Sequence, residues 1–100
     1  MKEIAFIWDI PKKENNKRVS LFKKLFGFKQ KYKSKHYYYN GILTKWSNGK
    51  RIVDCHHQIL GDSCFSIPEM ERNFVPAIAK AFKDLNIPAR KLVLIENELI

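Results

Sequence analysis

The dipeptide Asn48-Gly49 separates two strand-like runs, residues 36–46 and residues 51–60. Asn-Gly readily adopts the two positive φ angles of a type I′ turn, whose twist matches that of paired strands. Both runs are rich in tyrosine, isoleucine or valine, which favour strands. We therefore predict a β-hairpin with a two-residue loop, in which Trp46 faces Arg51.

The other elements follow from hydrophobic periodicity and from residues that end helices and strands. We predict, in chain order, a strand at 3–10, a helix at 16–26, the two hairpin strands, a helix at 67–86 and a strand at 91–95. The second helix is expected to be capped by Ser66 and to be kinked, or split into two pieces, at Pro76. Right-handed crossovers then place both helices on one face of a four-stranded antiparallel sheet. Residues 1–100 are expected to form a single α+β domain, a ferredoxin-like β-α-β-β-α-β sandwich.

Several features indicate the compartment. No apolar run approaches the roughly 20 residues that cross a bilayer, and the first residues lack the pattern of a signal peptide. Cys55 and Cys64 are too few for the disulfide framework of a small secreted domain, so we expect two reduced thiols. These features predict a soluble, cytoplasmic protein.

Positive charge is concentrated in the first half of the chain. The 19 Lys and Arg residues exceed the 10 Asp and Glu residues by nine, and residues 1–51 alone carry a net charge of +11. Such asymmetry indicates a polyanionic partner, or else lysines that solvate an ordinary surface. We predict a small, non-enzymatic nucleic-acid-binding protein, as expected of a virus, plasmid or defence system. Its phosphate contacts are expected from ten residues: Lys12, Lys13, Lys17, Arg18, Lys23, Lys24, Lys29, Lys31, Lys33 and Lys35.

Alternation along the predicted hairpin divides its side chains between two faces. The set expected under the helices is Tyr38, Ile42, Thr44, Val53, Cys55 and Ile59. The set expected on the open face is Tyr37, Tyr39, Leu43, Lys45, Asp54, His56 and Gln58. Tyr37 and Tyr39 would stack on bases beside the lysines. Alternatively, the open face makes the chain a protein-interaction module, with a homodimer across that face and an acidic protein on the basic surface.

A second alternative comes from the segment Phe6-Ile7-Trp8-Asp9-Ile10-Pro11, a hydrophobic strand that ends in Asp-Ile before a basic helix. This opening resembles that of the Cas2 family of small CRISPR adaptation proteins over residues 4–27, and the sequence departs from the family's pattern after Gly27. The resemblance implies a Mg²⁺-dependent nuclease that acts through Asp9, paired across a dimer. Asp54 or His56 would assist.

Residues 54–57 form the one cluster dense in metal-ligand types, Asp-Cys-His-His. Neighbouring histidines on a strand point to opposite faces and cannot share one ion, whereas a zinc site needs four convergent ligands. We therefore expect no metal site and no cofactor, with one of the two histidines half-buried under the helices and the other exposed.

Overall fold

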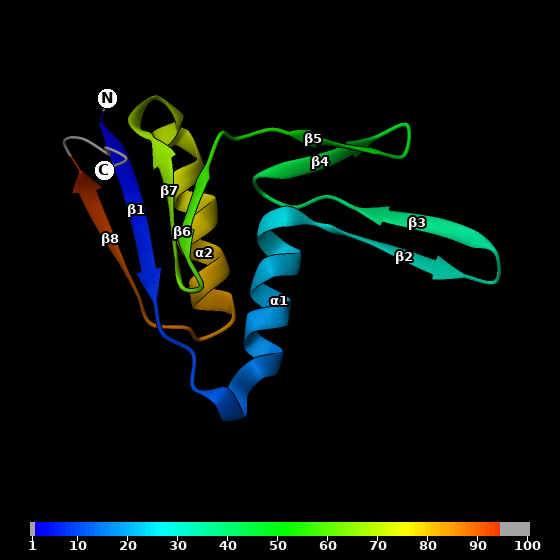
Figure 1. The fold of residues 1–100 in the computed structure, drawn as a ribbon, viewed down its shortest axis with the longest axis horizontal. Coiled ribbons are helices and arrows are strands. Elements are labelled where there is room, and N and C mark those ends of the chain that lie inside the picture. The colour runs from blue at the N-terminus through cyan, green and yellow to red at the C-terminus, as the bar shows by residue number, and fades with distance from the viewer. Residues whose placement is uncertain (1, 95–100) are drawn as a thin grey trace.

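The computed structural model describes residues 2–94. It has an α+β body and an arm of two β-hairpins that projects from one side of it (Figure 1). We call residues 28–53 the arm and the other described residues the body. The elements are β1 (Glu3–Trp8), η1 (Lys12–Glu14), α1 (Asn15–Phe26), β2 (Phe28–Tyr32), β3 (Lys35–Tyr39), β4 (Thr44–Ser47), β5 (Lys50–Val53), β6 (Gln58–Gly61), β7 (Cys64–Pro68), η2 (Glu69–Phe74), α2 (Val75–Asp84) and β8 (Ala89–Leu94).

The body contains a four-stranded antiparallel sheet in the order β6-β7-β1-β8. β1 is central, and alternation turns Ile4, Phe6 and Trp8 to the side that packs against the helices. The ring of Phe82, on α2, lies 6.5 Å from Phe6 and 5.4 Å from Trp8. Leu21 and Leu25 bring α1 into the same buried cluster, which also contains Phe65 and Ile67 of β7, so one core joins the sheet to both helices.

The arm is attached to the body at the end of α1. The last four carbonyls of a helix have no partner within the helix, and all four are satisfied here. The backbone N–H groups of Gly27, Ile42 and Leu43 donate to the carbonyl oxygens of Lys23 (2.9 Å), Lys24 (2.9 Å) and Leu25 (2.8 Å), respectively. The Thr44 hydroxyl donates to the carbonyl oxygen of Phe26. Three of the four donors belong to the arm, so its base forms the C-terminal cap of α1.

Two glycines allow this close approach. Gly27 has φ 70° and ψ −178°, a conformation that side chains strongly disfavour. A Cβ at Gly27 would lie 2.2 Å from the Tyr39 carbonyl oxygen, and one at Gly41 would lie 2.3 Å from the Gly27 nitrogen. The chain therefore leaves α1 and returns to it through backbone contacts that leave no room for a side chain.

Both hairpins have two-residue loops with positive φ at both positions. Asn48 and Gly49, at 51° and 75°, join β4 to β5, and Trp46 faces Arg51 as predicted. Lys33 and Ser34, at 48° and 67°, join β2 to β3. The first of these turns confirms the prediction from Asn-Gly. The second was not predicted, because neither lysine nor serine favours positive φ.

The predicted α+β class is confirmed, with two helices and a four-stranded antiparallel sheet, but two hairpins stand between α1 and β6. The plain β-α-β-β-α-β order is therefore not what the chain has. The predicted long hairpin is wrong, because its pairing stops at Thr44 opposite Val53. Tyr38 pairs instead with Lys29, since residues 40–43 turn back to cap α1.

The predicted cap of the second helix is wrong, and the helical residues begin at Glu69 as the 3-10 helix η2. Ser66 is fully buried in β7 opposite Ala5, and α2 begins at Val75. Pro76 lies in the first turn of α2, where its missing N–H costs no hydrogen bond. The predicted helix is therefore split into two pieces, η2 and α2, and is not kinked at Pro76.

The arm lengthens the molecule. The principal extents of the molecule are 48 × 34 × 27 Å, and its radius of gyration of 14.6 Å exceeds the value of about 13 Å typical of 100 compact residues. Within residues 2–94, neither helix is long and apolar enough to span a bilayer.

Candidate nucleic-acid interface

The arm has an unusual composition. Residues 28–53 contain seven Lys and Arg residues and no Asp or Glu, whereas the rest of the chain is nearly balanced at 12 basic and 10 acidic residues. The arm also holds six of the 13 aromatic residues, including all four tyrosines. One projecting part of the molecule therefore carries most of the net charge and the exposed rings.

The register of β2 and β3 gives their ribbon two different faces. We call the face turned toward β4 the inner face, because the Tyr38 ring there packs on Trp46 with centroids 5.0 Å apart. The inner face carries Lys29, Lys31, His36 and Tyr38. The opposite, outer face carries Phe28, Gln30, Tyr32, Lys35, Tyr37 and Tyr39.

The outer face presents a row of exposed rings. Tyr39 stacks on Phe28 with centroids 4.4 Å apart, and the Lys23 ammonium lies 4.7 Å from the centre of the Phe28 ring. At the other end, the Lys33 ammonium lies 5.4 Å from the centre of the Tyr32 ring. Tyr32 is 58%, Tyr37 43% and Tyr39 44% exposed. The row therefore begins and ends beside a lysine.

The inner face holds the two hairpins together. The Arg51 guanidinium lies 4.9 Å from the centre of the Trp46 ring, and the same ring packs on Tyr38. The Asn40 side-chain oxygen accepts a 2.8 Å hydrogen bond from the backbone N–H of Trp46. These contacts order the hairpins relative to each other and bring Arg51 beside the inner face.

The ten predicted phosphate contacts are not all near the arm. Lys29, Lys31, Lys33 and Lys35 lie on it, and Lys23 and Lys24 occupy the turn of α1 next to it. Lys12 and Lys13 lie in η1, before the first turn of α1, and Arg18 is half-buried near that end. Two of the ten also form ion pairs, Lys17 with Glu14 at 3.2 Å and Lys24 with Asp84 at 3.9 Å.

The arm also holds cations and rings that were not among the predicted nucleic-acid contacts. β4 and β5 contribute Lys45, Trp46, Lys50 and Arg51, and β2 contributes Tyr32. The absence of any carboxylate between residues 28 and 53 was a signal that could have extended the basic segment beyond Lys35.

The assignment of the open sheet face is wrong for most of its members. Tyr37, Tyr39 and Lys45 lie on the arm hairpins, and Leu43 is fully buried. In the set expected under the helices, Thr44 and Cys55 are buried, whereas Tyr38, Val53 and Ile59 are exposed. The sheet face opposite the helices carries Ala5, Ile7 and Ser66. The homodimer across this face stays a prediction.

Each residue of the nuclease alternative has different neighbours in this structure. Asp9 follows β1 and lines a surface hollow with Arg90, and Asp54 pairs with Lys45 at 3.7 Å. The exposed His56 reaches Glu71, with Nδ1 3.3 Å from Oε1. Among the described residues, no three His, Cys, Asp or Glu side chains gather as a metal site would require. A pair of Asp9 residues across a dimer stays a prediction.

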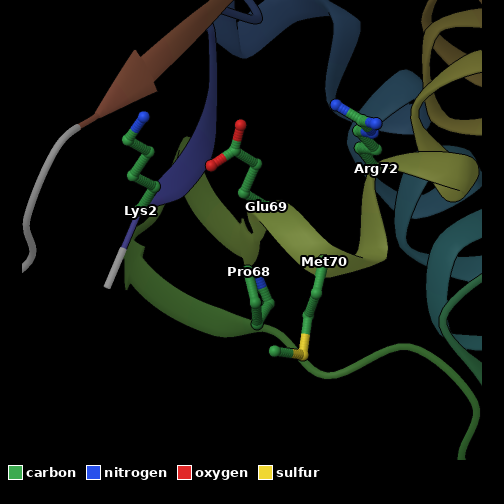
Figure 2. Close-up of a pocket in the computed structure, with 5 residues that line it drawn as sticks. All are labelled: Lys2, Pro68, Glu69, Met70 and Arg72. Atoms are coloured by element: carbon green, nitrogen blue, oxygen red, sulfur yellow. The ribbon is translucent and has the colours of Figure 1, made fainter.

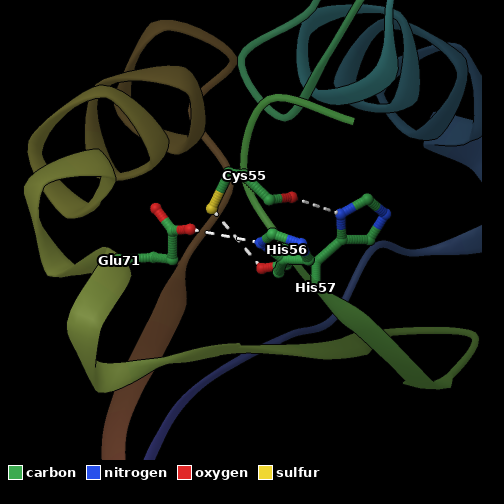
Figure 3. Close-up of polar contacts among 4 residues, drawn as sticks. All are labelled: Cys55, His56, His57 and Glu71. Carbon is green, nitrogen blue, oxygen red and sulfur yellow. Dashed lines mark hydrogen bonds and ion pairs between the residues drawn. The ribbon is translucent and has the colours of Figure 1, made fainter. Parts of the chain in front are cut away.

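Figure 3 shows the cluster at residues 55–57. His57 is half-buried, with Nδ1 2.9 Å from the Cys55 carbonyl oxygen and its ring 5.2 Å from that of Phe26. One histidine is thus exposed and the other half-buried, as predicted, although residues 54–57 do not form a strand. Burial, and then the charges of Glu71 and Asp54, raise the pKa of the Cys55 thiol to about 12. Both cysteines are free thiols, as expected.

A surface hollow lies on the body, outside the arm. Its volume is ≈ 490 Å³, and it is lined by Lys2, Pro68, Glu69, Met70 and Arg72 (Figure 2). Its charged side chains have both signs, so it lacks the purely positive character of the arm.

Comparisons with protein-family models, with curated proteins and with solved structures found no match.

Proposed function

We propose that this protein binds nucleic acid through its arm. The observation that carries the proposal is the concentration of seven cations and six aromatic residues, with no carboxylate, in a projecting pair of hairpins. Cationic side chains bind the phosphate backbone and release condensed counterions, while exposed rings offer surfaces to bases. The Lys23 and Lys24 side chains extend this positive surface onto the end of α1.

The turn at the tip of the first hairpin supports the proposal. Lys33 and Ser34 hold positive φ angles that Asn-Gly accommodates with little strain, as at residues 48–49 of the same arm. Backbone strain often persists where a side chain is needed for function. A lysine at this tip places an ammonium at the most projecting part of the ribbon.

The salt dependence of binding tests the proposal. Replacing Lys29, Lys31 and Lys33 together by alanine removes three arm cations from exposed positions, so the body should be undisturbed. Each phosphate contact with a single strand contributes about 0.7 to the slope of log K against log salt, so the slope should flatten by about 2. The measurement is fluorescence anisotropy of a labelled oligonucleotide between about 50 and 200 mM salt.

A matched control separates the arm from overall charge. Lys2, Lys83 and Lys91 are exposed residues of the body, and replacing them by alanine produces the same change in net charge, from +9 to +6. We expect this variant to keep nearly the wild-type slope. Equal slopes for the two triple variants would show that the arm is not the binding surface.

For the fold, we propose that the body is a variant of the ferredoxin-like arrangement into which the arm is inserted. With the two hairpins set aside, the chain order is β1, α1, β6, β7, α2 and β8, which is one strand, a helix, two strands, a helix and a strand. An experimental structure in which β6 does not pair with β7 would contradict this proposal.

A further inference from the structure

We infer that the outer face of the β2-β3 ribbon stacks unpaired bases, so that the arm binds single-stranded nucleic acid in preference to a duplex. This inference rests on the proposed function and names the form of nucleic acid. It depends on the three exposed tyrosines of that face, Tyr32, Tyr37 and Tyr39.

The spacing of the rings suits an extended strand. Residues on one face of a strand repeat every second position, about 7 Å apart. The outer face therefore places Tyr39 with Phe28, then Tyr37, then Tyr32 in successive steps along the ribbon. An extended single strand can lay successive bases on such a row, because every base has a π-face and stacking tolerates any sequence.

Tyr37 is the ring in this row best placed to take a base. Tyr39 already stacks on Phe28, and Tyr32 lies beside the Lys33 ammonium. Among residues 2–94, the Tyr37 ring has no stacking or hydrogen-bonding partner, and its neighbour across the ribbon is Gln30. A ring of this size left exposed in mid-strand offers a surface for an external aromatic group.

The placement of charge favours the same ligand. The outer face itself carries one cation, Lys35, while Lys23 and Lys33 lie at the two ends of the row. Phosphates of a strand that crosses the row can reach these lysines while its bases lie on the rings. In a duplex the bases are stacked on one another and present only their edges in the grooves, so the rings would have no base faces to contact.

The test compares Tyr37→Thr with Tyr37→Phe. Threonine keeps the preference for a strand but removes the ring, whereas phenylalanine keeps the ring. Affinities are measured by anisotropy for a single-stranded oligonucleotide and for the duplex of the same sequence. Tyr37→Thr should bind the single strand about 5- to 150-fold more weakly, the range for loss of one stacked base, and bind the duplex as the wild type does. Tyr37→Phe should bind both nearly as the wild type does.

A variant that lacks two arm lysines distinguishes failure of the base-stacking inference from failure of the proposed function. If Lys29→Ala with Lys31→Ala weakens binding to both forms while Tyr37→Thr changes neither, the arm binds nucleic acid but base stacking on the outer face is refuted. The inference is equally overturned if Tyr37→Thr weakens single strand and duplex alike. If wild type binds neither form at low salt, the proposed function itself fails. Circular dichroism and thermal unfolding establish that each variant is folded.

Discussion

Gly27→Ala should strongly destabilise the protein, because Gly27 lies where the arm joins α1. An alanine must adopt φ 70° and ψ −178°, which costs about 1–3 kcal/mol for a residue with a side chain. Its Cβ would also lie 2.2 Å from the Tyr39 carbonyl oxygen and 2.8 Å from the Gly41 nitrogen, both backbone atoms. Relieving such overpacking costs a further 1–3 kcal/mol or so. We expect the free energy of unfolding to fall by about 2–6 kcal/mol.

Gly61→Ala provides the matched control. Gly61 lies in β6, its φ is not positive, and a Cβ there would meet no atom within 4 Å. The free energy of unfolding should therefore change by less than about 1 kcal/mol.

Urea unfolding followed by circular dichroism measures both variants, and thermal unfolding provides a second readout. Each kcal/mol shifts the melting temperature of a domain this size by about 4–8 °C, so Gly27→Ala should lower it by at least about 8 °C. If the two glycine variants unfold at the same urea concentration, the close packing of the arm against α1 is refuted.

Two further perturbations test local features. Replacing Lys33-Ser34 by Asn-Gly should relieve the strain of the positive φ angles at the tip and stabilise the first hairpin by about 1 kcal/mol. Amide hydrogen exchange in β2 and β3 should become slower, and unchanged exchange would count against a strained turn. Burial, with Glu71 and Asp54, raises the pKa of Cys55 to about 12 from an unfolded value near 9, so the unfolded thiol ionises first as pH rises. The free energy of unfolding should then fall between pH 9 and 12 by up to about 1.4 kcal/mol per pH unit, more steeply than in Cys55→Ala. If urea unfolding gives the same pH dependence for the wild type and Cys55→Ala, a buried neutral thiol is contradicted.

The features predicted correctly have local causes. The Asn48-Gly49 turn follows from two residues that tolerate positive φ, and α1 follows from its apolar spacing and the glycine at its end. The first hairpin was missed because Lys33-Ser34 has no turn chemistry. β7 was taken for the start of a helix because the Ser66 to Glu69 pattern fits a capping box, whereas pairing with β1 determines its conformation.

The candidate site was likewise predictable only in part. Its charge is visible in the sequence, since composition alone reveals the basic half of the chain. Which lysines share a face with which tyrosines depends on pairing between strands. Tyr37 and Tyr39 were expected on the open face of a large sheet. They lie instead on a separate ribbon, opposite Gln30 and Phe28, while Lys29 and Lys31 point to its other face.

The central claim, that the arm is the nucleic-acid-binding surface, is tested most directly by nuclear magnetic resonance. Unlabelled single-stranded oligonucleotide is titrated at low salt into ¹⁵N-labelled protein, and the amide shifts are followed residue by residue. The account predicts the largest changes at residues 28–39 and 44–53, with smaller changes at the end of α1. Changes concentrated on β1, β7 or β8, with the arm amides unmoved at saturation, would contradict it.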